Sequence, residues 1–155
     1  MQGLKKIQDK KVLPPTYFMS SIFLVAIIHF VFPITKLIFF PWNLLGLPLL
    51  AIGGILNLLP DRDFNRFNTT VKPFEHSSKL ITSGTFRLSR NPMYLGMGIF
   101  LTGESMLFGS LGPFIIPIVF VVLMHFIFII PEEKMLLEKF HEEYKAYTNK
   151  VRRWI

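Results

Sequence analysis

The sequence contains no cysteine, and this absence excludes several kinds of chemistry. Without thiols the chain forms no disulfide, carries no thiolate nucleophile and offers no sulfur ligand to a metal ion. Its histidines are few and lie far apart, without the short spacings that are typical of metal ligands. These histidines are His29, His76, His125 and His141. No metal site is therefore expected.

Acidic residues are also scarce, with ten Asp and Glu against seventeen Lys and Arg, which gives a formal net charge of +7. In a soluble protein such an excess would suggest a nucleic-acid partner. Here 51% of the residues are hydrophobic, and the basic residues cluster at the ends of long apolar runs. Since membrane proteins collect Lys and Arg in their cytosolic loops, we expect a membrane protein and no nucleic-acid partner.

The apolar runs predict an all-α, polytopic membrane protein with a single domain, residues 1–155. A hydrocarbon core about 30 Å thick requires roughly 20 apolar residues per helix. No small-residue cleavage site follows the first run, which indicates a retained span rather than a signal peptide. The predicted elements are spans at about 17–40, 43–59, 93–108 and 114–130, a cytosolic loop at 60–92, and an amphipathic cytosolic helix at 131–148.

The distribution of basic residues predicts an orientation for these spans. Sixteen of the seventeen Lys and Arg residues lie in the N-terminal segment, the loop at 60–92 and the tail, whereas the opposite side holds only Lys36. The positive-inside rule then places both termini and this loop in the cytosol. The same topology brings the Arg90-Asn91 corner and the Glu132-Glu133 pair to one interface, because they bracket the third and fourth spans.

The Arg90-Asn91-Pro92 corner carries polar residues directly into an apolar span. Asn91 precedes proline and is biased away from the helical region, while Pro92 fits the first turn of a helix. The open amide groups and the positive dipole end of such a helix suit a carboxylate or a phosphate. The alternative is that Arg87 and Arg90 are interfacial anchors and that Tyr94 belongs to an aromatic belt.

Two further sets of residues have both a functional and a structural interpretation. Glu132 and Glu133 lie in a first helical turn, where they could bind hydroxyl or ammonium groups or simply complement the helix dipole. Aromatic residues recur at helical spacing in the tail and could cover a flat ring or pack the helix.

Glu104 lies inside an apolar span, where an ionisable group usually faces a cavity or a partner. We therefore treat it as a candidate catalytic residue.

The second half of the chain resembles the isoprenylcysteine carboxyl methyltransferase and phospholipid methyltransferase superfamily. The resemblance rests on four motifs in the same order and spacing. They are Leu80-Ile81-Thr82-Ser83-Gly84-Thr85-Phe86, Arg90-Asn91-Pro92-Met93-Tyr94-Leu95-Gly96, Glu132-Glu133, and Phe140-His141-Glu142-Glu143-Tyr144-Lys145-Ala146-Tyr147 followed by Val151-Arg152. The family consists of integral membrane enzymes that bind S-adenosylmethionine at the cytosolic interface.

The resemblance implies a set of site residues for this chain. The implied cofactor-binding positions are Ser78, Lys79, Leu80, Ile81, Phe86, Asn91, Pro92, Met93, Tyr94, Glu132, Tyr144 and Arg152. The candidate catalytic residues are Arg90, Glu133 and Glu104. The implied reaction transfers a methyl group from S-adenosylmethionine to a lipophilic acceptor, an amine, carboxylate or thiol that enters from the bilayer.

Two other functions are compatible with the sequence. Membrane sterol reductases show a similar Asn/His-Pro-x-Tyr corner and bind a nicotinamide cofactor, NADPH. A small membrane scaffold could also use basic loops of this kind to bind anionic lipid. The oligomeric state and the identity of the methyl acceptor are not predicted.

Overall fold

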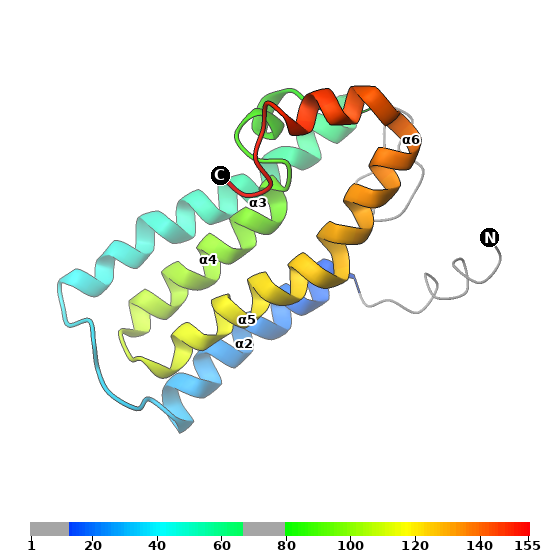
Figure 1. Cartoon of the computed structure of the whole chain (residues 1–155). Helices are drawn as coiled ribbons and strands as arrows, with labels where there is room; N and C mark the ends of the chain where they lie inside the picture. The colour runs from blue at the N-terminus through cyan, green and yellow to red at the C-terminus, as the bar shows by residue number, and fades with distance from the viewer. Residues whose placement is uncertain (1–12, 67–79) are drawn as a thin grey trace.

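A computed structural model of the protein describes residues 13–66 and 80–155. Within these residues all the named secondary-structure elements are helices. Four long helical rods form a bundle, and the last one bends so that its end lies across the bundle (Figure 1). Three segments are long and apolar enough to cross a membrane: Pro14–Val31, Trp42–Pro60 and Gly112–Thr148. The remaining rod, helix α4 (Pro92–Phe108, 17 residues), lies beside them and is the third in chain order. The predicted all-α polytopic membrane fold is confirmed.

The first helix, α2 (Pro14–Val31), is shorter than predicted. The expected span 17–40 is wrong beyond Val31, because Pro33 disfavours helical geometry at Phe32 and donates no backbone hydrogen bond. The segment that follows lies against the turn between α4 and α5. There the N–H groups of Leu37 and Ile38 donate to the carbonyl of Gly109 at 2.8 and 3.0 Å.

The second rod begins with a 3-10 turn, η1 (Trp42–Leu45), and continues as α3 (Gly46–Arg66). Its start agrees with the predicted span 43–59, but the prediction that a loop begins at residue 60 is wrong, because the helix continues through Pro60 to Arg66. Proline removes only one intrahelical hydrogen bond, and tertiary packing of α3 compensates for a local loss of this kind. Pro60 itself is fully buried.

Helices α3 and α4 are in close contact through glycines. A Cβ atom on Gly53 would lie 2.5 Å from the backbone nitrogen of Phe100 and 2.7 Å from the carbonyl oxygen of Gly96. Gly46 and Gly103 meet in the same way about two helical turns away. Small residues permit this approach in membranes, where van der Waals packing holds helices together. Gly54, by contrast, has no described residue within 4 Å of its Cβ position.

The last rod is continuous from α5 (Ile115–Met124) through a π-helical turn, η4 (His125–Ile129), into α6 (Ile130–Thr148). The predicted bounds 114–130 and 131–148 agree with these elements, but the chain does not leave the helix between them. The wide turn precedes Pro131, which lacks a backbone donor, and π-turns absorb such interruptions. A second break follows at His141, where φ is 41° and ψ is −114°. It divides α6 into a first arm (130–140) and a second arm (142–148).

Apolar side chains divide into a shared core and an exposed surface. The core joins Phe18 and Val25 of α2 to Leu101 of α4 and Met124 of α5. Large apolar side chains on the outer faces of the rods are exposed, which is the distribution expected where helices face lipid rather than water. They include Phe23, Ile27, Leu47, Ile52, Leu58, Ile118 and Val122.

Candidate functional site

A cluster of charged side chains lies at the end of the bundle where α4 begins. The Glu133 carboxylate on the first arm of α6 is 3.4 Å from Nη2 of Arg90, which lies in the loop before α4. The same carboxylate accepts hydrogen bonds from Nη2 of Arg153 at 2.6 Å and from its Nε at 3.0 and 3.1 Å. Both the Arg90 and the Glu133 side chains are largely buried. One acidic group therefore links two arginines that lie far apart in the sequence.

The charged pair has an electrostatic consequence for Arg153. Its hydrogen bonds to the Glu133 carboxylate raise the pKa of the Arg153 guanidinium. An arginine so placed remains fully charged, and the planar guanidinium suits two-pronged contact with a carboxylate.

A second contact joins α4 to α6 next to this cluster. The Tyr94 hydroxyl donates to Oε1 of Glu132 at 3.0 Å, and the Tyr94 ring stacks on Phe128 with centroids 6.2 Å apart. Tyr94 is 8% exposed. The two predicted motifs therefore meet at two neighbouring points, Arg90 with Glu133 and Tyr94 with Glu132. The predicted convergence of the corner and the glutamate pair is present in the structure.

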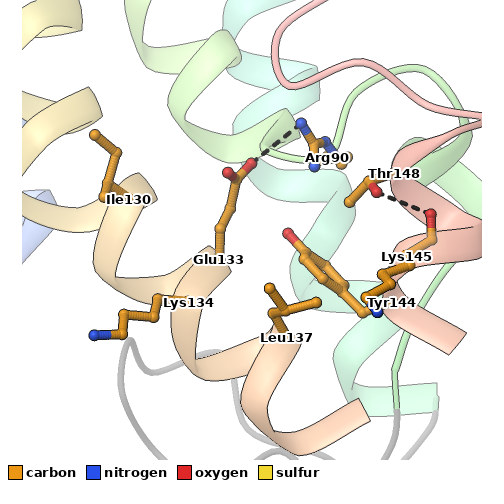
Figure 2. Close-up of a pocket in the computed structure, with 8 residues that line it drawn as sticks. All are labelled: Arg90, Ile130, Glu133, Lys134, Leu137, Tyr144, Lys145 and Thr148. Atoms are coloured by element: carbon orange, nitrogen blue, oxygen red, sulfur yellow. Dashed lines mark hydrogen bonds and ion pairs between the residues drawn. The ribbon is translucent and has the colours of Figure 1, made fainter. Parts of the chain in front are cut away.

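A pocket of about 470 Å³ lies beside the cluster (Figure 2). Its two sides come from the two arms of α6, and Arg90 reaches it from the loop before α4. Nε of Arg90 is buried and has no hydrogen-bond partner among the described residues. The lining residues are Arg90, Ile130, Glu133, Lys134, Leu137, Tyr144, Lys145 and Thr148. The pocket thus combines apolar surface with an excess of positive charge.

The predicted site residues have different positions relative to this pocket. Arg90, Glu133 and Tyr144 line it, and Tyr94 and Glu132 pair next to it. Asn91 and Pro92 are buried at the corner, where the Asn91 side chain donates to the Arg153 carbonyl at 3.0 Å. Met93 is half-buried in the first turn of α4, and Phe86 accepts a hydrogen bond through its carbonyl from Tyr147 at 2.7 Å.

Other predicted residues lie farther away or cannot be placed. Leu80 and Ile81 precede the 3-10 turn η2 (Gly84–Arg87) and do not line the pocket, and Ser78 and Lys79 fall outside the described residues. Arg152 contributes its carbonyl, which accepts from the N–H of Arg90 at 3.0 Å, while its side chain is exposed.

Glu104 is not part of the cluster. It lies about 18 Å along α4 from Pro92, at 1.5 Å per residue. It is half-buried, and its Oε2 has no hydrogen-bond partner among the described residues. The structure does not bring this carboxylate to Arg90 and Glu133.

Sequence reasoning missed two contributors to the site, Arg153 and Ser89. The Ser89 hydroxyl donates to the Arg153 carbonyl at 3.1 Å and accepts from the N–H of Asn91 at 3.1 Å. Ser89 and Asn91 are both buried. A polar residue three positions before a proline is a weak signal in a sequence, and a hydrogen bond to a backbone carbonyl of the tail leaves no pattern in it.

Comparison with known families decides the assignment. The sequence model of the phospholipid methyltransferase family matches residues 42–143, about two thirds of the chain. The chain belongs to the phospholipid methyltransferase family. Among curated proteins, none matches this chain. The predicted resemblance is confirmed, and membership indicates a membrane methyltransferase.

The phospholipid methyltransferase match covers α3, α4, α5 and the first arm of α6. It includes the Arg90 corner, Tyr94 and the Glu132-Glu133 pair. It ends before Tyr144 and before Arg153, so the second side of the pocket and the tail lie beyond the matched residues.

Proposed function

We propose that this protein transfers a methyl group from S-adenosylmethionine to a lipophilic acceptor, a lipid or small molecule that enters from the bilayer. The observation that carries the proposal is the meeting of Arg90 with Glu133, beside a pocket, in a chain of the phospholipid methyltransferase family. The nature of the acceptor, an amine, carboxylate or thiol, is part of the same proposal.

The residues of the pocket fit the methyl donor. Its volume of about 470 Å³ lies in the range of small-molecule sites. Arg90 presents a buried Nε without a partner among the described residues, which suits the donor carboxylate. Leu137 and the ring of Tyr144 provide apolar surface for a flat base. Glu133, which also lines the pocket, would accept hydrogen bonds from the ribose hydroxyl groups.

The protein would contribute binding and orientation rather than covalent chemistry. S-adenosylmethionine supplies, when bound, an electrophilic methyl group on a sulfonium sulfur. The chain would hold the acceptor in line with that methyl group and exclude water. Neither role requires a nucleophilic side chain. Arg90 and Glu133 therefore act here as binding groups that fix the geometry of the reaction.

Ligand binding separates this function from the alternatives. Purified protein in detergent is titrated with S-adenosylmethionine, with its demethylated product and with NADPH, and its thermal stability is followed. A ligand at about 100 times its Kd stabilises the native state by about 2.7 kcal/mol. A response to the first two ligands is expected. A rise in thermal stability with NADPH alone would support a reductase. No change with any of the three ligands would favour a scaffold that binds anionic lipid.

Tyr94→Phe is expected to weaken donor binding, because it leaves the Glu132 carboxylate without the hydroxyl that donates to it. The unpaired acceptor itself destabilises the folded protein by about 1–3 kcal/mol, and the carboxylate loses the contact that fixes its orientation beside the pocket. Isothermal titration with S-adenosylmethionine measures the change. Tyr17→Phe is the control, since Tyr17 packs edge-on against the same Phe128 ring at 5.8 Å. Equal affinities for the two variants would contradict a role for the Tyr94 hydroxyl.

Glu104→Gln is expected to leave the affinity for S-adenosylmethionine unchanged. The reason is its position about 18 Å along α4 from Pro92. Donor affinity and turnover of the variant are compared with those of the wild-type protein. A loss of donor affinity would show that Glu104 reaches the site in a conformation other than this one.

We also propose that both termini and the donor pocket face the cytosol, on the basis of the basic residues in the loop at 60–92 and the tail. The absence of native cysteine makes single-cysteine variants clean reporters. Lys150 and Lys36 are both exposed. In sealed cells, a membrane-impermeant maleimide is expected to label Lys36→Cys and to spare Lys150→Cys until the membrane is opened. The reverse pattern would place the pocket on the outer face.

A further inference from the structure

The last residues of the chain form a strap across the Arg90 corner, and we define this C-terminal strap as residues 151–154. Two of its carbonyls accept hydrogen bonds from the corner. That of Arg152 accepts from the N–H of Arg90 at 3.0 Å, and that of Arg153 accepts from Ser89 and Asn91 at 3.1 and 3.0 Å. The strap therefore binds the loop before α4 through its backbone, independently of its side chains.

The Arg153 side chain makes a separate connection, to α6. Its guanidinium holds the Glu133 carboxylate by two-pronged contact, with the shortest N to O distance 2.6 Å. The following residue, Trp154, stacks on His125 in the π-helical turn with ring centroids 6.5 Å apart. The strap thus ties the corner, α6 and the turn between α5 and α6 to one another.

The Glu133 carboxylate lies between Arg153 and Arg90. Of these two arginines, Arg90 lines the pocket and Arg153 does not. Without Arg153, the largely buried Glu133 would keep, among the residues that the structure describes, the ion pair with Arg90 at 3.4 Å to fix its orientation. A carboxylate that rotates freely would also leave the Arg90 guanidinium without a fixed carboxylate partner. Two-pronged contact with a second arginine removes this freedom.

We propose that Arg153 is a positioning residue, which holds Glu133 so that Arg90 stays oriented to receive the carboxylate of the methyl donor. The inference rests on the proposed function, since it concerns the donor site. It adds to that function a residue beyond the family match, which ends at residue 143. Arg153 itself does not line the pocket.

The test compares Arg153→Ala with Lys150→Ala, which removes an exposed basic side chain from the same tail. Titration with S-adenosylmethionine is expected to give about a tenfold weaker affinity for Arg153→Ala and no change for Lys150→Ala. In a turnover assay the KM for the donor should rise by the same factor, whereas kcat at saturating donor stays near that of the wild-type protein. A general loss of structure would lower kcat or the yield of folded protein instead.

Two more variants show whether Arg153 acts through Glu133. Arg153→Lys keeps the charge but not the two-pronged contact, and should recover part of the affinity. In the Glu133→Gln background, adding Arg153→Ala should cause no further loss, because the partner is already removed. Equal affinities for Arg153→Ala and Lys150→Ala, or additive losses in the double variant, would overturn the inference alone. A wild-type protein that does not bind the donor would overturn the proposed function and this inference with it.

Discussion

Glu133→Gln is expected to weaken the binding of S-adenosylmethionine roughly 30- to 150-fold, through the loss of about 2–3 kcal/mol. The substitution keeps the shape of the side chain but removes its charge. The Arg90 and Arg153 guanidiniums then face each other without the acidic group that separates them. Since the Arg90 side chain is only 13% exposed, water compensates poorly for the lost partner. Calorimetric titration of the detergent-solubilised protein measures the affinity.

The control for this experiment is Glu142→Gln on the same helix. Glu142 pairs with Lys145 at 2.6 Å, but its side chain is 82% exposed. Exposed pairs of this kind contribute little to stability. The control is therefore expected to bind the donor as the wild-type protein does. Should Glu133→Gln retain wild-type affinity, the three-residue cluster would not belong to the donor site.

Gly53→Ala is expected to destabilise the folded protein by about 1–3 kcal/mol, because the new methyl group meets backbone atoms of α4. The nearest of these atoms, the Phe100 nitrogen and the Gly96 oxygen, cannot move aside as a flexible side chain would. The two helices must separate. A shift of α4 also displaces Tyr94 near its start, so donor binding should weaken together with thermal stability.

Gly54→Ala is the control for the glycine contact, since it makes the same chemical change one residue along the same helix. In the part of the chain that the structure describes, its Cβ position has no neighbour within 4 Å. Alanine favours a helix over glycine by about 1 kcal/mol, so this variant should be as stable as the wild-type protein or more so. Thermal unfolding in one detergent compares the two. Similar melting temperatures for both variants would contradict close packing of α3 on α4.

The sequence predicted the elements that have a strong local signal. Pro92 begins α4, and the last helix begins one residue before Pro131, because proline fits a first helical turn. The meeting of Arg90 and Glu133 followed from topology, since a hairpin of two spans returns to the face from which it started. The helix ends at Val31 and Arg66 were not predicted. Apolar residues continue past Val31, which made the first span appear longer, and Pro60 precedes Arg66, which made the second span appear shorter.

The contacts of the tail could not be predicted for a different reason. Ser89 and Asn91 bind the carbonyl of Arg153, and a carbonyl is the same at every residue. The resemblance pointed to Arg152, whereas the arginine side chain that binds Glu133 belongs to its neighbour. In an irregular segment neither periodicity nor capping determines which of two adjacent arginines turns inward.

The break at His141 has a consequence for how the pocket is built. Glu133 and Leu137 lie on the first arm of α6, and Tyr144 and Thr148 lie on the second. A single bent helix therefore supplies both sides of the pocket (Figure 2). The angle between the two arms, and so the width of the pocket, depends on the backbone torsions of His141. An unbroken helix would carry the same side chains along a straight line and enclose nothing.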